Sequence, residues 1–208
     1  MKLYYFETPN PRRPVAAAKH LGLDVELVKL NLGEGENKSD EFTAINPNRK
    51  VPALVDGETN VWESYAIMLH LAQKAGSDFG PQNDAEQVET LRWAAWDLAH
   101  FSRHAGRLLW ENFVKPTFDL GASNQEEIDD ASGFFQQFAG VLDDHLAGND
   151  YVVGSRLTLT DFGIAAFLPS AGSAKLPLDG FANVARWHEG LLQNDAWANP
   201  WPDGGKDM

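Results

Sequence analysis

The pattern of this chain changes at a short polar segment, SDFGPQNDA, which occupies residues 77–85. Before it, short apolar runs of strand length alternate with helical stretches in the order β-α-β-α-β-β-α. After it, four long stretches carry apolar residues at helical spacing, and no run has a comparable strand pattern. Gly, Pro and Asn are typical of linkers. We therefore predict an α/β domain at residues 1–76, a linker at 77–85 and an all-α domain at 86–208.

Residues typical of turns and caps divide the first part into elements. Gly22 is suited to end a helix, Ser39 to cap the next one, and Asp56-Gly57 to turn a hairpin. The expected elements are strands at 2–6 and 25–32, helices at 14–22, 39–46 and 64–76, and a hairpin within 51–62.

Composition limits the chemistry that this chain can perform. The 208 residues are 43% hydrophobic, which is enough for a substantial core. Acidic residues outnumber basic ones by 30 to 17, and the net charge of -13 disfavours nucleic acid as a partner. The chain has no cysteine, which excludes disulfides, thiolate metal sites and a protein thiolate nucleophile.

Targeting signals are not evident in the sequence. The beginning, MKLYYFETPN, lacks the long apolar segment of a signal peptide. No window approaches the roughly 20 apolar residues that a membrane span requires. We therefore expect a cytoplasmic protein with no membrane partner.

The segment NPNRKVPALVDGETNVWES, residues 46–64, combines several groups that can hold a small zwitterionic peptide. If the Val51-Pro52 bond is cis, the Val51 backbone can pair with an extended ligand. Ser64 opens a helix whose free N–H groups attract a carboxylate, and Glu63 can accept from an amine. The alternatives are a trans proline that opens an edge strand and a serine that only caps a helix.

A second motif lies in HLAGNDYVVGSRLTLTDFGIAAFL, near residues 145–168. Thr158 and Asp161 have the spacing of a capping box, in which each side chain bonds the backbone N–H of the other end. We expect this motif to stabilise a buried helix and to perform no chemistry.

Together these two segments resemble soluble glutathione transferases, and the resemblance covers nearly the whole chain. It implies a thioredoxin-like N-terminal domain, an all-α C-terminal domain and a homodimer. It also implies glutathione as co-substrate and no metal. The cis Pro52 would let Val51 pair with the cysteinyl backbone, while Glu63 and Ser64 would bind the γ-glutamyl end. The residues implied to bind glutathione are Lys38, Lys50, Val51, Pro52, Glu63 and Ser64.

The turn TPNP at residues 8–11 departs from the common pattern of that family, because Pro9 stands where theta-like classes have a serine. The TPN tripeptide is similar to bacterial nu-class-like members. That similarity implies that Thr8 and Asn10 donate hydrogen bonds to the sulfur and lower its pKa.

A purely structural interpretation of the same turn stays open. Asn10 is a preferred N-cap, and Pro11 a preferred first helical residue. Pro14 would lose a backbone bond inside a helix, so we expect the helix to begin near Arg12 or Pro14, which would free Asn10 for a ligand.

The long helical stretch 85–114 supplies candidates for a second substrate. His100 and His104 are spaced i,i+4, as some metal ligands are, but no third ligand is evident. By resemblance this stretch lines the acceptor pocket, although tryptophans at such spacing are usually core. The candidates for that pocket are Arg103, His104, Arg107 and Trp110.

Two classes of function follow from the sequence. The first is a glutathione transferase that directs the thiolate at an electrophile, a disulfide or a peroxide. The second is a glutathione-binding carrier or regulatory module, which the loss of serine at Pro9 favours. A glutathione-dependent isomerase would use the same site.

Overall fold

The computed structural model describes residues 1–207, which divide into two compact units. The N-terminal unit comprises residues 1–80 together with 194–207, and the helical unit comprises residues 81–193. The boundary near residue 80 falls inside the predicted linker. The C-terminal segment 194–207, predicted as part of the all-α domain, belongs instead to the N-terminal unit. It packs there because the buried Trp201 stacks on Tyr5, with ring centroids 5.7 Å apart.

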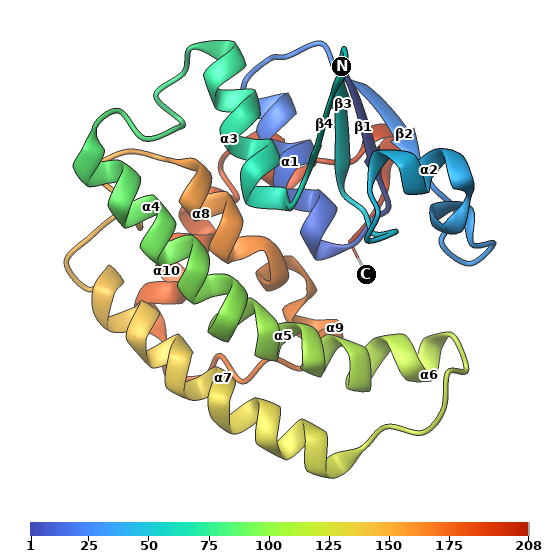
Figure 1. Cartoon of the computed structure of the whole chain (residues 1–208). Coiled ribbons are helices and arrows are strands. Elements are labelled where there is room, and N and C mark those ends of the chain that lie inside the picture. Colours follow the sequence, from blue (N-terminus) through green and yellow to red (C-terminus); the bar gives the residue numbers. More distant parts are fainter. Residues whose placement is uncertain (208) are drawn as a thin grey trace. The chain divides into compact units, whose positions relative to one another are not determined.

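The N-terminal unit contains a four-stranded sheet in the order β2-β1-β3-β4. Strand β1 is parallel to β2 and antiparallel to β3, and β3 is antiparallel to β4. Helices α1 and α3 pack against each other, as the N-terminal part of Figure 1 shows. The elements are β1 Lys2–Tyr5, α1 Pro9–His20, β2 Glu26–Lys29, α2 Asp40–Ile45, β3 Ala53–Asp56, β4 Thr59–Trp62, α3 Ser64–Ala75 and α11 Asp195–Ala198.

Side chains alternate across β1 and build a core on each face of the sheet. Tyr4 meets Phe42 of α2 edge-on, with ring centroids 5.5 Å apart. Leu3 and Tyr5 point to the opposite face and are buried. Ser39 caps α2 by accepting a hydrogen bond from the Phe42 N–H at 3.2 Å, as the sequence predicts.

The helical unit contains no strand among its described residues, as the sequence predicts. Residues 84–117 form one continuous helical run with π-helical turns at Asp97–Phe101 and Trp110–Val114. Helices α5 and α7 pack together, and the rings of Phe101 and Phe135 stack 4.9 Å apart. The helices are α4 Asp84–Trp96, α5 Ser102–Leu109, α6 Lys115–Thr117, α7 Gln125–Leu146, α8 Leu159–Ile164, α9 Ala171–Ala174 and α10 Ala182–Leu191.

The predicted capping box of α8 is confirmed. Asp161 accepts from the Thr158 N–H at 2.9 Å, and the Thr158 hydroxyl oxygen accepts from the Thr160 N–H at 3.3 Å. Asp161 also accepts from the Val152 N–H at 2.9 Å and from the Trp187 indole N–H at 3.0 Å. These bonds tie three segments of the helical unit to one buried carboxyl group, so the motif has a structural role.

Candidate functional site

The TPNP turn leads directly into α1, which begins at Pro9. The prediction that this helix starts near Arg12 or Pro14 is therefore wrong, and so is the alternative that Asn10 is its N-cap. Thr8 holds the N-cap position with an extended backbone (φ −127°, ψ 159°). A proline at the first helical position is tolerated because its missing N–H would have no partner there.

Two polar side chains of this turn remain able to donate. The Thr8 hydroxyl lies 3.5 Å from the Phe6 carbonyl oxygen, at the limit of a hydrogen bond, and it does not cap the helix. Asn10 is exposed, and its NH2 group has no hydrogen-bond acceptor among residues 1–207. Both groups stand at the start of α1, where the helix dipole favours an anion.

Arg13 joins this turn to the start of α3. Its Nη1 donates to Asn10 Oδ1 at 2.7 Å and to Ser64 Oγ at 3.2 Å. The side chain is 0% exposed, and its guanidinium carbon lies 5.3 Å from the centroid of the Tyr65 ring. Sequence reasoning missed Arg13. A pair of arginines at the start of an otherwise apolar helix is the signal that could have indicated it.

The Val51-Pro52 bond is cis, as the resemblance implies. Pro52 is buried, and Val51 is half-buried just before β3 begins. Within the described chain, the Val51 backbone N–H and C=O form no hydrogen bond. Asn46 shapes the preceding loop, because its side-chain NH2 donates to the Lys50 carbonyl oxygen at 2.6 Å. The Val51 backbone is therefore free to pair with a ligand.

Glu63 occupies a left-handed backbone conformation (φ 71°, ψ 120°) immediately before α3. Such a conformation is costly for a residue with a side chain and occurs mainly at functional positions. The Glu63 side chain is exposed, and Ser64 is buried as the first residue of α3. The turn therefore presents a carboxylate beside the free N–H groups of a helix start.

The two lysines predicted to meet a glycyl carboxylate lie on neighbouring segments. Lys38 ends a short 3₁₀ turn, Glu36–Lys38, and Lys50 precedes Val51. The Asn37 side-chain NH2 donates to the Arg49 carbonyl oxygen at 2.7 Å, which joins the two segments beside these lysines. Both lysines are exposed, and neither forms an ion pair in the part of the chain that the structure describes.

Three of the four predicted acceptor residues line one cavity in the helical unit. Arg103, His104 and Arg107 border a cavity of about 680 Å³ between α5 and α7. Trp110 does not line it and is 45% exposed. The rest of the wall consists of Ala99, His100, Glu127, Asp130, Phe134 and Phe138.

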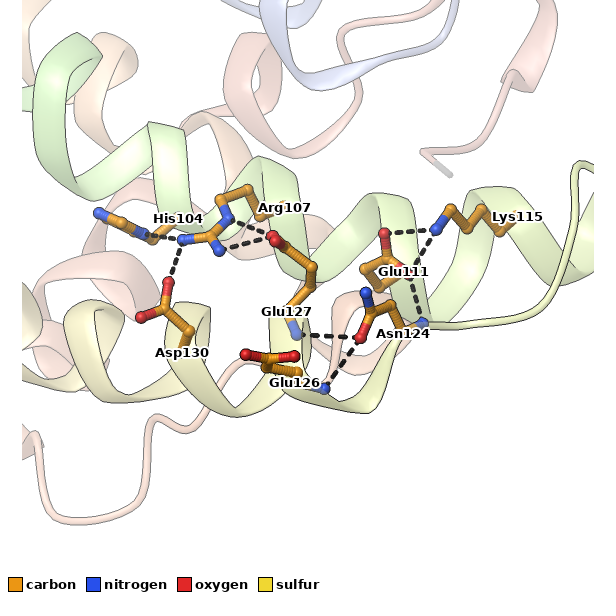
Figure 2. Close-up of polar contacts among 8 residues, drawn as sticks. All are labelled: His104, Arg107, Glu111, Lys115, Asn124, Glu126, Glu127 and Asp130. Atoms are coloured by element: carbon orange, nitrogen blue, oxygen red, sulfur yellow. Dashed lines mark hydrogen bonds and ion pairs between the residues drawn. The ribbon is translucent and has the colours of Figure 1, made fainter.

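Arg107 lies between two carboxylates of α7, as Figure 2 shows. Arg107 forms ion pairs with Glu127 at 2.6 Å and with Asp130 at 2.8 Å. His104 is buried, and its ring stacks on Phe134 with centroids 4.9 Å apart. Burial lowers the pKa of His104, and the nearby cations Arg107 and Arg103 lower it further.

The two histidines of this helix contact a phenylalanine. His100 and His104 both stack on Phe138, at 4.6 Å and 5.8 Å between ring centroids. Among residues 1–207, no three His, Asp or Glu side chains gather in a group that could hold a metal ion. No helix in that range is long and apolar enough to cross a membrane.

Both parts of the chain match known family domains. Residues 1–73 match the glutathione S-transferase N-terminal domain, and residues 102–195 match the C-terminal domain. The chain belongs to the glutathione S-transferase family. The family and its fold class, a thioredoxin-like α/β domain followed by an all-α domain, are thereby confirmed. The similarity to nu-class-like members stays a prediction.

Individual members of the transferase family match over most of their length. Glutathione S-transferase 3 of Zea mays is 32% identical over 205 residues, covering 95% of this chain and 91% of that protein. The structure of a Phanerochaete chrysosporium glutathione transferase with oxidized glutathione has a TM-score of 0.84 and 26% identity, covering 96% and 94% of the two chains. That of maize glutathione S-transferase I with an atrazine glutathione conjugate has a TM-score of 0.87 and 25% identity, covering 96% and 95%.

Proposed function

We propose that this transferase binds glutathione, stabilises its thiolate and directs the thiolate at a small electrophile, a disulfide or a peroxide. The observation that carries the proposal is the link through Arg13. It joins Asn10 at the start of α1 to Ser64 at the start of α3. Groups suited to a thiolate and groups suited to a γ-glutamyl carboxylate therefore lie within one side chain of each other.

Thr8 and Asn10 are the proposed catalytic residues. The Thr8 hydroxyl and the Asn10 NH2 would donate to the sulfur, and donors to an anion lower its pKa. A thiol pKa of about 8.5 leaves only a few per cent thiolate at neutral pH, so a decrease of about two units makes the thiolate predominant. Neither residue is a base at this pH, so the proton leaves to solvent.

The glutathione backbone would be held by groups on three segments of the N-terminal unit. The Val51 N–H and C=O would pair with the cysteinyl residue beside the cis Pro52. Ser64 would bind the γ-glutamyl carboxylate through its N–H and hydroxyl, and Glu63 would accept from the amine. The remaining carboxylate, on glycine, would be bound by Lys50 and Lys38.

The acceptor substrate would lie against side chains of the helical unit. Arg107 is neutralised by two carboxylates. Arg103 makes no hydrogen bond or ion pair within residues 1–207, so it is the cation that would meet an anionic or conjugated acceptor. His104 would add an aromatic surface to the same cavity, whereas Trp110 lies outside its wall and could meet an acceptor only beyond it. The relatives' ligands, oxidized glutathione and a glutathione conjugate, support both disulfide and electrophile chemistry.

The covalent step differs between these acceptors. With an electrophilic carbon, the thiolate sulfur forms a C–S bond while the leaving group departs with its electron pair. With a disulfide, the sulfur forms a new S–S bond while the old one breaks and releases a thiolate. With a peroxide, the thiolate sulfur bonds to one oxygen while the O–O bond breaks, and the other oxygen leaves with the electron pair and takes up a proton as alcohol or water. The product on glutathione is a sulfenic acid. A second glutathione thiol would then reduce this product to the disulfide and release water.

The alternative is a glutathione-binding carrier or regulatory module. The observation that favours it is Pro9, which occupies the first helical position and offers no hydroxyl or N–H. A carrier would bind glutathione through Val51 and Ser64 but would leave its thiol unperturbed. Turnover of a model electrophile separates the two functions.

Assembly and location complete the proposal. A homodimer is supported by exposed apolar side chains on α4, where Val88 is 64% and Leu91 is 63% exposed. Sedimentation or light scattering of the purified chain tests it. A cytoplasmic location stays a prediction.

The deciding experiment measures the ultraviolet absorbance of the thiolate of bound glutathione as a function of pH. We expect the wild-type thiol to titrate well below the free value, and Thr8→Ala and Asn10→Ala to move it back by about one unit each. If the bound thiol titrates as it does in solution, the transferase proposal fails and the carrier function stands.

A further inference from the structure

Arg13 contacts two residues of the proposed site. Its Nη1 donates to Asn10 Oδ1 at 2.7 Å and to Ser64 Oγ at 3.2 Å. The whole side chain is buried, and its guanidinium lies against the Tyr65 ring. Packing therefore fixes the guanidinium at the point where α1 and α3 begin.

The chemistry of a guanidinium determines how its partners must be oriented. It carries five N–H donors in a planar fork and has no acceptor. A group bonded to it must therefore present an acceptor atom, which in Asn and Ser side chains is the oxygen. Asn10 turns its amide oxygen to Arg13, which directs its NH2 away. Ser64 accepts through its oxygen, which leaves its hydroxyl hydrogen free to point elsewhere.

The two ends of glutathione that would meet these residues are anions. A thiolate and a carboxylate both accept hydrogen bonds and repel oxygen lone pairs. An Asn10 amide without Arg13 could turn and present its oxygen to the sulfur, which would raise the thiol pKa. A Ser64 hydroxyl without Arg13 could donate inward and present its oxygen to the carboxylate.

We propose that Arg13 is a positioning residue that orients the donors of Asn10 and Ser64 toward the thiolate and the γ-glutamyl carboxylate of glutathione. The inference rests on the proposed function, because it assumes that Asn10 faces the sulfur. It adds a residue that acts on both ends of the same ligand through two different neighbours.

The test is a mutant cycle on the thiol titration, with wild type, Asn10→Ala, Arg13→Met and the double variant. We expect Arg13→Met to raise the pKa of the bound thiol by about one unit, a ten-fold change in its ionisation constant. In the Asn10→Ala background the same substitution should add little, because the group that it orients is gone. An equal rise in both backgrounds would show that Arg13 acts by its charge alone and would overturn the positioning role.

The cycle also separates this inference from the proposed function. If Asn10→Ala leaves the thiol pKa unchanged, Asn10 does not contact the sulfur and the proposed function of that residue fails. If Asn10→Ala raises the pKa while Arg13→Met does not, only the positioning role of Arg13 fails.

Arg13→Lys serves if the Met variant does not fold, since it keeps the charge and the apolar stem. Both bonds come from one nitrogen, Nη1, which the planar guanidinium holds in place against the Tyr65 ring. The lysine side chain is shorter and lacks that planar group, so we expect a partial rise in the thiol pKa. The matched control is Arg12→Lys, the same change on the neighbouring buried arginine, which should leave the thiol pKa unchanged. An effect as large in the control as in Arg13→Lys would overturn the inference.

The Ser64 branch has its own readout, the affinity for S-methylglutathione, which has no thiolate. We expect Arg13→Met and Ser64→Ala each to weaken binding about ten-fold, and the double variant to be weakened little further. Losses that multiply fully would show that Arg13 does not act through Ser64 and would overturn this half of the proposal.

Discussion

Two neighbouring arginines of α1, Arg12 and Arg13, are both buried but serve different sides of the helix. Arg12 donates to the Asp207 carboxylate and to the Trp197 carbonyl oxygen, and its guanidinium lies 4.6 Å from the centroid of the Trp197 ring. Arg13 donates to an uncharged amide and an uncharged hydroxyl at the candidate site. One arginine thus secures the C-terminal segment, while the other orients polar groups.

The two arginines differ in the charge of their hydrogen-bond partners. Asp207 is a carboxylate, so its pair with Arg12 is complete and leaves no charge for a ligand. Burial lowers the pKa of Arg12, and the nearby Asp207 opposes that change and keeps the pair charged. Asn10 and Ser64 are uncharged, and both lie at the candidate site. We therefore expect substitutions on the Arg12 side to change stability, and those on the Arg13 side to change the chemistry of the thiol.

The largest expected effect is on the Arg12 side, at Trp201. This side chain is 6% exposed, stacks on Tyr5 and donates its indole N–H to Asp207 at 2.9 Å. We expect Trp201→Ala to lower the free energy of unfolding by about 3–5 kcal/mol, measured by urea denaturation. The matched control is Trp62→Ala, because Trp62 is 41% exposed and should cost much less. If Trp201→Ala costs no more stability than Trp62→Ala, the packing of the C-terminal segment contributes little to the stability of the fold.

The next effect is at Arg12 itself. Arg12→Met removes one partner of a largely buried ion pair and leaves Asp207 without its cation, so we expect a loss of about 3 kcal/mol. The thiol pKa of bound glutathione should not change, in contrast to Arg13→Met. Both quantities are measured on the same preparation, by denaturation and by thiol titration. If Arg12→Met raised the pKa of the bound thiol as much as Arg13→Met does, the two arginines would not differ in their effect on the thiol.

The sequence predicts the fold well because its signals are local. The Ser39 cap, the Asp56-Gly57 turn and the Thr158 capping box each depend on residues a few positions apart, and all three lie where the sequence places them. The start of α1 is the exception, because the rule that a proline delays a helix does not hold for Pro14. The structure tolerates Pro14 inside the helix and gives Asn10 a side-chain partner instead.

The candidate site was only partly predictable, because its decisive contacts are distant in sequence. Arg13 and Ser64 are 51 positions apart, and Arg12 and Asp207 are 195 apart. No periodicity connects such pairs, so the sequence could not distinguish two adjacent arginines. The acceptor candidates show the same limit. Helical spacing groups Arg103 with Arg107, but it cannot show that α7 supplies two carboxylates to Arg107.

A third arginine, Arg107, also forms ion pairs, and its substitution shows whether such pairs stabilise the helical unit. It is partly exposed, so Arg107→Met should cost only about 1 kcal/mol. The same change removes a cation that lowers the pKa of His104, so that pKa should rise toward its ordinary value. NMR titration of the imidazole checks this direction.

The pH dependence of stability follows from the same shift. Because the folded pKa of His104 lies below the unfolded one, the unfolded state takes up protons first. Stability is therefore lost as pH falls through the ordinary histidine value of about 6.5, and this slope should become shallower in Arg107→Met. A steeper slope would contradict this account, because it would mean that removal of Arg107 lowers the pKa of His104 further.

The smallest expected effect concerns Lys29, which pairs with Glu7 at 2.6 Å beside the TPNP turn. Lys29 is about half exposed, so Lys29→Gln should cost about 0.3 kcal/mol of stability. Its hydrogen bond to Glu7 raises the pKa of Lys29, so this contribution is present below the ordinary lysine pKa and is lost as pH rises through the raised value.

Lys29→Gln also leaves the Glu7 charge uncompensated next to Thr8. We therefore expect the thiol pKa of bound glutathione to rise by about 0.2 units at low salt and less at high salt, because exposed charges are screened. A rise that is independent of salt would mean that Lys29 acts on the conformation of the TPNP turn and not through its charge. Lys29 of β2 would then belong with Arg13 among the residues that position the site.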